Sequence, residues 1–578
     1  MNAIVTLPQP TRRSTGQRQA LVQTAHVRLM ILMLMIGAGF FLVIARIAML
    51  GVLIAPANAA MTPGGLMQRG DITDRNGAPL ARTIAAWTIA IHPREVLGDR
   101  HVIAQQLAAI MPEQPEAFYY DALTKNVSFT YLDRHASPAR VNAVHALGEP
   151  AIVFAQEAER LYPQSTLAAH VLGYVAPTDK DPRTIGRAGM ERAFEERLTL
   201  PSERSAPLTL SIDARVQAAM ESELGRAMVD FKAKDATGVV LDVATGEIVS
   251  MVSLPVYNPN KLKGTTADSL RNNVTQSVYE LGSTFKPITM AAAINDGVVT
   301  DMSKRFDATV PLQVGRFTIH DDRGDEQRRW LNIPETLIYS SNIATARIAD
   351  ELGQQRLSGM FAALGFNQKP AVELKEKARP LWPTFWARTT VMTTAYGHGI
   401  AVTPLQLANA YATLVNGGIW RPTTLLKVAP GAAPAGRRVL SEATSARMRQ
   451  LLRLVVLKGT GRKADVPGYR VGGKTGTAEV ADAGGYNHKA NVSTFAAAFP
   501  MDHPRYVVVA MIDSPIGNAQ SFGLTTAAWT VAPVVNRVIA RTGAMLGVIP
   551  DDKRDVDVSD LLPLLWQAPG DKKLAHIE

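Results

Sequence analysis

A long apolar stretch near the start of the chain most restricts the structures that it can adopt. Leu29–Ala45 contains 17 uncharged, mostly apolar residues, Arg46 interrupts it, and Ile47–Ile54 is apolar again. As an α-helix, 17 residues extend roughly 26 Å, which just spans the hydrocarbon core of a bilayer. We therefore predict a membrane-spanning helix over residues 29–54, with Arg46 at or just inside the far interface.

The charges before this stretch predict its orientation. Residues 1–28 contain arginine but no acidic residue, and basic flanks stay in the cytoplasm. We expect a cytoplasmic tail over residues 1–28, with the chain beyond residue 60 outside the cytoplasmic (inner) membrane. Ala57-Asn58-Ala59 imitates a signal-peptidase site, so a cleaved signal is the alternative. Because the apolar region is longer than a usual signal core, an uncleaved single-pass anchor is the preferred interpretation.

Length and composition exclude several classes of protein. The 578 residues are too many for one core and predict two or three domains. There is no cysteine for a disulfide or thiolate metal site, and the 11 histidines include no pair four residues apart. The net charge of +10 comes without a cluster of basic and aromatic residues, so we expect no nucleic-acid partner. His398, between two glycines, is interpreted as a turn or packing histidine.

The stretch Tyr279–Pro287 predicts a nucleophile at the start of a helix. Good helix formers follow it, Gly297 is a stop signal, and a proline is tolerated in a first turn. Ser283 and Lys286 are three residues apart, so a helix places them on one face, with the serine at the positive end of the helix dipole. A lysine base must lose its proton, and lowering its pKa from ~10.4 to ~7 costs about 4.6 kcal/mol. Burial beside a second cation supplies an effect of that size.

Two further motifs supply the groups that a lysine base requires. Ser340-Ser341-Asn342 lies between two helical patterns, and Lys474-Thr475-Gly476-Thr477 lies within the extended-looking run Tyr469–Val480. Lys474 is the second cation. A lone Ser-x-x-Lys is common by chance. Ser-x-x-Lys, Ser-x-Asn and Lys-Thr-Gly in this order, however, form the motif set of the penicillin-recognising serine acyltransferases.

The rest of the chain divides into a spacer and a catalytic domain. Residues 61–205 consist of short extended pieces without a nucleophile–base arrangement, and Arg69–Ala81 predicts a hairpin. From residue 206 to about 550 the pattern predicts an α+β domain, with helices from the middle and the end of the sequence. Its five strands, expected to be antiparallel, are 237–242, 248–253, 469–479, 493–499 and 506–513. Residues 551–578, charged at both ends, are expected to be a peripheral tail.

The chain as a whole resembles a class B penicillin-binding protein, a monofunctional peptidoglycan D,D-transpeptidase. The likeness lies in the anchor, the three active-site motifs and the segments Arg69–Gly77, Gly186–Glu191, Thr209–Gln217, Gly238–Pro259 and Val402–Asn416. It implies an elongated, mainly-β or mixed pedestal (dimerisation-like) domain over 61–205. It also implies a penicillin-binding serine transpeptidase domain over 206–550, with a five-stranded antiparallel sheet flanked by helices and an all-helical part. One departure is Thr199–Pro207, which is short and glycine-free where the family has a glycine-rich, basic linker.

The resemblance implies acyl transfer without a metal or organic cofactor. Ser283 attacks the carbonyl between the two terminal D-alanines of a stem peptide, with Lys286 as the base. Ser340, with Lys474 near it, passes a proton to the departing D-alanine. Asn342 holds Lys286 and the substrate amide. The acyl-enzyme is then attacked by the amine of a neighbouring stem peptide.

The resemblance also assigns the substrate-binding residues. Thr475, Gly476 and Thr477 form the binding edge, and the two threonine hydroxyls bind the substrate carboxylate. The backbone N–H groups of Ser283 and Thr477 form an oxyanion hole, in which one donor contributes about 3 kcal/mol. β-Lactams imitate the D-alanyl-D-alanine end and are expected to acylate Ser283 stably.

Motif details favour septal over side-wall synthesis. The last residue of Lys474–Thr477 is threonine where elongation-type relatives often have serine, and Gly399–Ala408 resembles the division-type form. The implied partners are a polytopic glycosyltransferase of the SEDS family, packed against residues 29–54 and the pedestal, and other division proteins. Gly37, Ala38 and Gly39 permit close approach of helices. An elongation-type transpeptidase of the side wall is the alternative.

Single features of the sequence also fit three other functions. Gly468–Thr475 also fits the phosphate-binding loop of an ATPase, but a strand-like run continues where that motif requires a helix. A non-catalytic β-lactam sensor or scaffold is expected to carry a cytoplasmic effector, for which residues 1–28 leave no room. A secreted β-lactamase needs neither anchor nor pedestal, and it releases hydrolysed drug where a transpeptidase stays acylated.

Overall fold

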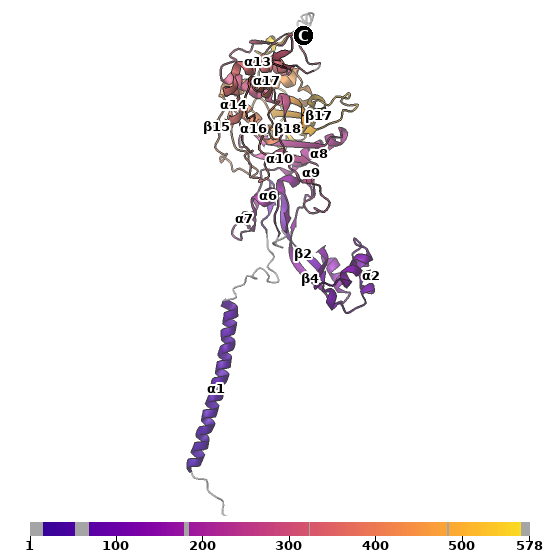
Figure 1. The fold of residues 1–578 in the computed structure, drawn as a ribbon, viewed down its shortest axis with the longest axis vertical. Coiled ribbons are helices and arrows are strands. Elements are labelled where there is room, and N and C mark those ends of the chain that lie inside the picture. The colour runs from indigo at the N-terminus through magenta and orange to yellow at the C-terminus, as the bar shows by residue number, and fades with distance from the viewer. Residues whose placement is uncertain (1–14, 53–68, 178–183, 323, 483–484, 568–578) are drawn as a thin grey trace, which may run out of the picture. The chain divides into compact units, whose positions relative to one another are not determined.

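The computed structural model describes residues 15–52, 69–177, 184–322, 324–482 and 485–567 (Figure 1). It begins with one long helix, α1 (Thr15–Val52). Within α1, His26–Ile44 is long and apolar enough to cross a membrane, judged by length and composition. The predicted tail is therefore partly helical, because its second half contains no proline and many good helix formers. The cleavage motif at 57–59 lies outside the described residues.

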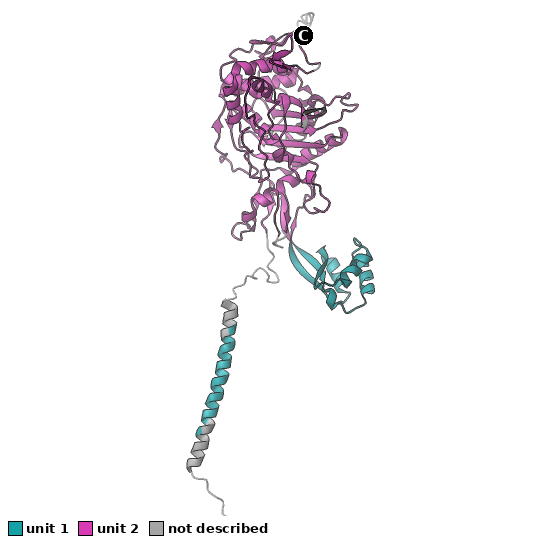
Figure 2. Ribbon diagram, in the orientation of Figure 1, with its two compact units in different colours: residues 1–67, 85–158 teal, residues 68–84, 159–578 magenta. Residues whose placement is uncertain are grey.

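The chain forms two compact units, one of residues 1–67 and 85–158, the other of residues 68–84 and 159–578 (Figure 2). In the first unit, β2 (Pro79–Ile91) pairs with β3 (Thr130–Ala136) antiparallel and also with β4 (Ile152–Leu161). Three helices share a core with these strands: α2 (Arg100–Ile110), α3 (Glu116–Thr124) and α4 (Pro138–His145). Ile89, Leu107 and Leu123 are fully buried in that core.

The hairpin predicted at the start of the pedestal is confirmed. β1 (Ile72–Thr73) pairs antiparallel with the first residues of β2, with Ile72 opposite Ala81. β1 also pairs parallel with β7 (Leu208–Thr209). Residues 68–84 and 159–205 consequently cluster with the catalytic domain, so the compact units do not divide at residue 205, where the sequence predicted a boundary.

Buried ion pairs join these segments of the second unit. Nε of Arg160 lies 2.7 Å from Oε1 of Glu191, and Nη2 of Arg69 lies 2.7 Å from Oε2 of Glu195. Arg69 also pairs with Glu191, which is fully buried. Removing one member would leave an uncompensated buried charge, which is strongly destabilising.

The catalytic part contains the predicted five-stranded antiparallel sheet. Its order is β16-β17-β18-β8-β9. The strands are β8 (Asp235–Asp242), β9 (Ile248–Leu254), β16 (Gly472–Asp482), β17 (Gly485–Phe499) and β18 (Tyr506–Asp513). β17 begins earlier than predicted, because β16 and β17 continue as a hairpin beyond the edge of the sheet core.

Two hydrophobic cores cover the two faces of the sheet. Alternate residues of β8 belong to different cores, Val240 to one and Val239 to the other, as the two-residue repeat of a strand requires. The first core includes α8 (Ala214–Asp230) and α19 (Ala532–Thr542). The second includes α11 (Lys286–Asn295) and α16 (Pro404–Val415). The α+β fold class is confirmed.

The remaining elements are short or belong to the helical part of the catalytic domain. The helices are α5 (Ala169–Leu172), α6 (Gly189–Ala193), α7 (Glu195–Thr199), α9 (Ala267–Leu270), α10 (Asn273–Gln276), α12 (Ile333–Ile338), α13 (Asn342–Leu352), α14 (Gln354–Ala363), α15 (Arg388–Thr394), α17 (Glu442–Lys458) and α18 (Ala527–Thr530), with 3₁₀ turns η1 (Pro93–Glu95), η2 (Gly282–Phe285), η3 (Arg462–Ala464) and η4 (Leu562–Leu564). The strands are β5 (Val175–Ala176), β6 (Ile185–Gly186), β10 (Arg305–Asp307), β11 (Leu312–Val314), β12 (Phe317–Ile319), β13 (Trp330–Asn332), β14 (Ile419–Trp420) and β15 (Arg437–Arg438).

The described part of the C-terminal segment, residues 551–567, packs against the catalytic domain. Leu561 is fully buried in the larger core. Nη2 of Arg453 on α17 lies 2.7 Å from Oδ2 of Asp555, and the N–H of Trp566 donates to Oε1 of Glu335 on α12 at 2.8 Å. This differs from the predicted peripheral tail, because a few apolar residues between the charged ones reach the core.

Candidate active site

Ser283 lies in a 3₁₀ turn that leads directly into a helix. η2 is followed without a break by α11, with Pro287 in its first turn. Residues three apart lie above one another in a 3₁₀ helix, which places Ser283 and Lys286 on the same side. Ser283 is 8% exposed and Lys286 is fully buried. The predicted helix start is confirmed, with a tighter first turn than expected.

Two glycines allow this turn to lie against β16. A Cβ on Gly476 would lie 2.4 Å from the carbonyl oxygen of Leu281, and a Cβ on Gly282 would lie 2.8 Å from that of Thr477. Gly282 also has a φ of +52°, which glycine adopts at little cost. The close approach brings the Lys-Thr-Gly motif beside the Ser283 turn.

Ser340 joins the two lysines. Its Oγ lies 3.1 Å from Nζ of Lys286 and 2.9 Å from Nζ of Lys474. Its carbonyl oxygen also accepts a hydrogen bond from Lys286. Among the described residues, no hydrogen bond links the Ser283 hydroxyl to Lys286; such catalytic bonds often form only when substrate is present. The structure therefore brings the three motifs together around one hydroxyl.

Burial changes the pKa of both lysines in the direction that a base requires. It lowers the pKa of Lys286 to about 8, against the opposing effect of the Asp322, Asp321 and Asp325 carboxylates. It lowers the pKa of Lys474 well below its ordinary value, and the charge of Lys286 adds to the effect. The charge of Lys286 thus disfavours that of Lys474, whereas burial alone lowers the pKa of Lys286.

Asn342 and its neighbour bond to the loop before them. Nδ2 of Asn342 donates to the carbonyl oxygen of His320 at 3.0 Å and to Oδ1 of Asp322 at 3.3 Å. In the described part of the chain, no hydrogen bond joins the Asn342 side chain to Lys286, and its Nδ2 donates to the loop instead. Oγ of Ser341 donates to the Asp321 carboxylate. No pattern in the sequence points to Asp321, since it lies twenty residues from Ser341 and in no motif.

The two threonines of the Lys-Thr-Gly motif are held differently. Oγ1 of Thr475 lies 3.2 Å from Nζ of Lys474 and 2.7 Å from Oγ1 of Thr460. Oγ1 of Thr477 accepts from the N–H of Ala527 at 3.2 Å, which leaves its proton available to a carboxylate. Both hydroxyls can therefore take part in the binding of an anion beside the lysine.

His398 lies in a turn beside the active site. Its neighbours Gly397 and Gly399 both have positive φ, +85° and +76°. Nδ1 of His398 lies 3.5 Å from Oε2 of Glu280, and the N–H of Gly399 donates to Oε1 of that carboxylate at 3.0 Å. The histidine thus sits in a turn that is bonded to the segment just before the nucleophile.

The phosphate-loop interpretation is wrong. Residues Gly472–Asp482 form one strand, β16, which contains Lys474, and β17 follows it where a phosphate loop needs a helix. Within the described ranges, no group of three or more His, Asp or Glu side chains is arranged to hold a metal ion.

A serine at a helix start, a buried lysine on the same turn and a second lysine sharing a hydroxyl with it define a serine acyltransferase. The description "Penicillin binding protein transpeptidase domain" matches residues 236–536, and "Penicillin-binding Protein dimerisation domain" matches residues 66–199.

Curated relatives agree with these domain matches. The chain is 44% identical over 490 residues to the probable peptidoglycan D,D-transpeptidase FtsI of Caulobacter vibrioides, covering 83% of this chain and 82% of the relative. It is 30% identical over 523 residues to the peptidoglycan D,D-transpeptidase FtsI of Escherichia coli K12, covering 84% of each. It is also 30% identical to the stage V sporulation protein D of Bacillus subtilis, covering 84% and 79%. The chain belongs to the class B penicillin-binding proteins.

Proposed function

We propose that this chain is a peptidoglycan D,D-transpeptidase that cross-links stem peptides through an acyl-enzyme on Ser283. The observation that carries the proposal is the Ser340 hydroxyl, which lies within hydrogen-bonding distance of both Lys286 and Lys474. A hydroxyl held between two lysines of lowered pKa forms a path along which a proton can move between them.

In the acylation step, neutral Lys286 takes the proton of the Ser283 hydroxyl as its Oγ attacks the carbonyl between the two D-alanines. The C–N bond then breaks, and Lys474 supplies a proton through Ser340 to the departing amine. In the second step the amine of a neighbouring stem attacks the ester, its proton enters the same path, and Ser283 recovers the proton held by Lys286. Protons are balanced over the two steps.

Substrate binding follows from the groups around this path. We assign the substrate carboxylate to Lys474 and the hydroxyls of Thr475 and Thr477, and the oxyanion to the N–H groups of Ser283 and Thr477. Gly476 acts through its lack of a side chain, since a Cβ would strike the backbone of the nucleophile turn. Asn342 is assigned to the substrate amide, whose N–H its Oδ1 can accept while its Nδ2 donates to the loop 320–322.

The experiment uses the full-length chain in detergent, with pentapeptide-bearing glycan strands as donor and acceptor. We expect cross-linked dimeric muropeptides, abolished by penicillin and by Ser283→Ala, and a penicilloyl adduct that outlives the reaction. Hydrolysis of the stem peptides without cross-linking would contradict the proposal and favour a hydrolase. Rapid release of hydrolysed penicillin would do the same.

We also propose that α1 crosses the inner membrane with its N-terminus in the cytoplasm. The support is the apolar span His26–Ile44 and the four arginines, without acidic residues, at 1–28. A reporter fused after residue 60 should be active only outside the cytoplasm. Activity of the fusion inside the cytoplasm, or a mature chain that starts at Ala60, would contradict the assignment.

The cellular role we propose is septal synthesis. The support is the threonine at position 477, the division-type segment Gly399–Ala408 and the likeness to relatives named FtsI. Depletion of the chain should give filamentous cells, and a fluorescent fusion should gather at mid-cell. Rounded cells that still divide, with signal along the lateral wall, would favour the elongation-type alternative.

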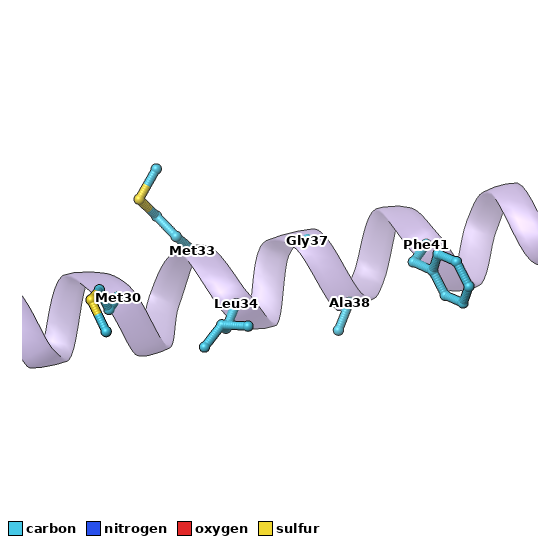
Figure 3. Close-up of a pocket in the computed structure, with 6 residues that line it drawn as sticks. All are labelled: Met30, Met33, Leu34, Gly37, Ala38 and Phe41. Carbon is cyan, nitrogen blue, oxygen red and sulfur yellow. The ribbon is translucent and has the colours of Figure 1, made fainter.

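The partner we propose is a polytopic glycosyltransferase of the SEDS family that packs against α1, beside other division proteins. Figure 3 shows Gly37 and Ala38 between the larger side chains of Leu34 and Phe41, so that the helix surface is hollowed there. Small residues allow helix axes to approach closely. Gly39 does not line this hollow, since two residues turn a helix by about 200°.

Cysteine cross-linking tests this contact without interference, because the chain has no cysteine of its own. Ala38→Cys should cross-link to a cysteine placed in the partner's membrane helices. Leu32→Cys, which the 100° turn per residue places opposite the middle of this hollow, is the matched control and should not. Equal cross-linking from both positions would contradict a specific packing face.

A further inference from the structure

The Asp321 carboxylate binds the turn that carries Ser340. Both of its oxygens lie 3.0 Å from Oγ of Ser341, which donates to them, and the N–H of Ile343 donates to Oδ1 at 3.0 Å. Asp321 is 7% exposed. Because a buried carboxylate without donors is costly, these bonds hold loop and turn together.

The turn itself is strained. Ser340 has a φ of +58°, a region that a residue with a Cβ rarely adopts and keeps only when its surroundings impose it. Ser341 follows as the cap of α13 and accepts from the N–H of Ala344 at 3.1 Å. Asp321 thus holds Ser341 and Ile343, which follow the strained residue Ser340 in the chain.

We propose that Asp321 is a positioning residue for acylation, which holds the Ser340 hydroxyl between the two lysines by binding Ser341 and Ile343. Among the residues that the structure describes, no hydrogen bond joins Asp321 to Ser283, Lys286 or Lys474. The inference rests on the proposed function above, because it assigns a residue to the proton path of that reaction. If the turn relaxed, the hydroxyl would leave the position from which it reaches Lys286 at 3.1 Å and Lys474 at 2.9 Å.

Asp321 also acts on Lys286 through its charge, and this effect can be separated from positioning. Asp322, Asp321 and Asp325 raise the pKa of Lys286, against the larger effect of burial, which lowers it. Removing one of these negative charges therefore lowers the pKa of Lys286. Acylation needs neutral Lys286, so the acidic limb of its pH–rate profile should move to lower pH.

Four variants of the full-length chain in detergent separate the two effects, with the acylation rate constant measured against fluorescent penicillin from pH 5.5 to 9. Asp321→Ala should acylate about 10–100-fold more slowly at saturating penicillin, as expected for a misplaced catalytic group, and its acidic limb should lie at lower pH. Ser341→Ala breaks the hydrogen bonds to Asp321 but keeps the charge of Asp321. It should slow acylation without moving the acidic limb of the pH–rate profile. Asp321→Asn, which keeps part of the contact, should move the limb with a smaller loss of rate.

The matched control is Asp307→Ala. Asp307 accepts from the N–H of Thr309 at 2.9 Å and from its hydroxyl at 2.6 Å, the same kinds of donor, and it is not among the carboxylates that shift either lysine. It should keep the wild-type profile.

Acylation by Asp321→Ala within threefold of wild type at saturating penicillin would overturn the proposal, wherever the acidic limb lies. So would an equal loss in Asp307→Ala, which would mark a general loss of stability. If Asp321→Ala does not fold, Ser341→Ala decides by its acylation rate, because it breaks the same contact. Absence of labelling in the unsubstituted chain would instead refute the proposed function.

Discussion

The pair Asp235 and Asp513 makes the stability of the catalytic unit depend on pH. The two residues lie opposite each other at the ends of β8 and β18, and each is 6% exposed. Oδ1 of Asp235 is buried without a hydrogen-bond partner in the described structure. Burial, and next the Asp513 carboxylate, raise the pKa of Asp235 from 3.8 to about 7. Asp235→Asn removes this ionisation and keeps the shape of the side chain.

The raised pKa of Asp235 determines the sign and the size of the change in folding stability with pH. A carboxyl with a higher pKa in the folded state binds more protons folded than unfolded between the two values, so stability falls as pH rises from about 4 to about 7. Above about 7 the loss is complete. Between pH 5 and pH 8 the loss due to Asp235 is on the order of 2.5 kcal/mol. For a unit of this size that corresponds to about 3–5 °C in Tm.

Thermal unfolding of the full chain in detergent, followed by tryptophan fluorescence, measures this difference. Of the 7 tryptophans, only Trp87 lies in the first unit, so the signal reports on the catalytic unit. The gain in Tm of Asp235→Asn over wild type should be about 3–5 °C larger at pH 8 than at pH 5. Asp296→Asn, an exposed carboxylate, is the control and should show no such difference. An equal gain at both pH values, or a less stable Asp235→Asn at pH 8, would refute the reasoning.

Three further predictions follow from the lysines and the C-terminal segment. Lys286→Gln and Lys474→Gln should each slow penicillin acylation at least about 10²-fold. The first substitution removes the base, and the second removes a donor to Ser340. Near-normal acylation by Lys286→Gln would rule out the lysine base. The wild-type acylation rate should fall as pH drops below about 8, because the base Lys286 becomes protonated, and a rate that is constant from pH 6 to 9 would contradict this. Leu561→Ala should destabilise the catalytic unit by about 2–5 kcal/mol, because it leaves a cavity at a fully buried position. The loss should be seen as a lower Tm. An unchanged Tm would show that residues 551–567 do not pack on the core.

The sequence predicts those parts of the fold that local patterns determine. Ser283 and Lys286 are three residues apart, and the proline after them marks the helix start, so η2 and α11 could be expected. Apolar or extended-looking runs predicted each of the five strands. The order of the three motifs predicted that Ser340 and Lys474 lie beside Ser283 and Lys286.

Contacts between distant segments could not be predicted in the same way. Asp321 reaches Ser341, and Asp235 meets Asp513, only through the tertiary arrangement of a loop and the register of two strands. Asn342 was assigned to Lys286 by resemblance, yet its amide is held by the loop at 320–322. Residues 551–578 are charged at both ends, which predicted a peripheral tail, and only the fold reveals that Leu561 meets the core.

Peptide mapping of the penicillin adduct tests the central assignment most directly. The full-length chain is labelled in membranes, digested and examined by mass spectrometry, beside Ser283→Ala and Ser340→Ala. We predict that the penicilloyl group lies on the peptide that contains Ser283 and that no adduct forms in Ser283→Ala. Ser340→Ala should still be labelled at Ser283, more slowly. An adduct on Ser340 or on any other residue, or undiminished labelling of Ser283→Ala, would contradict the account.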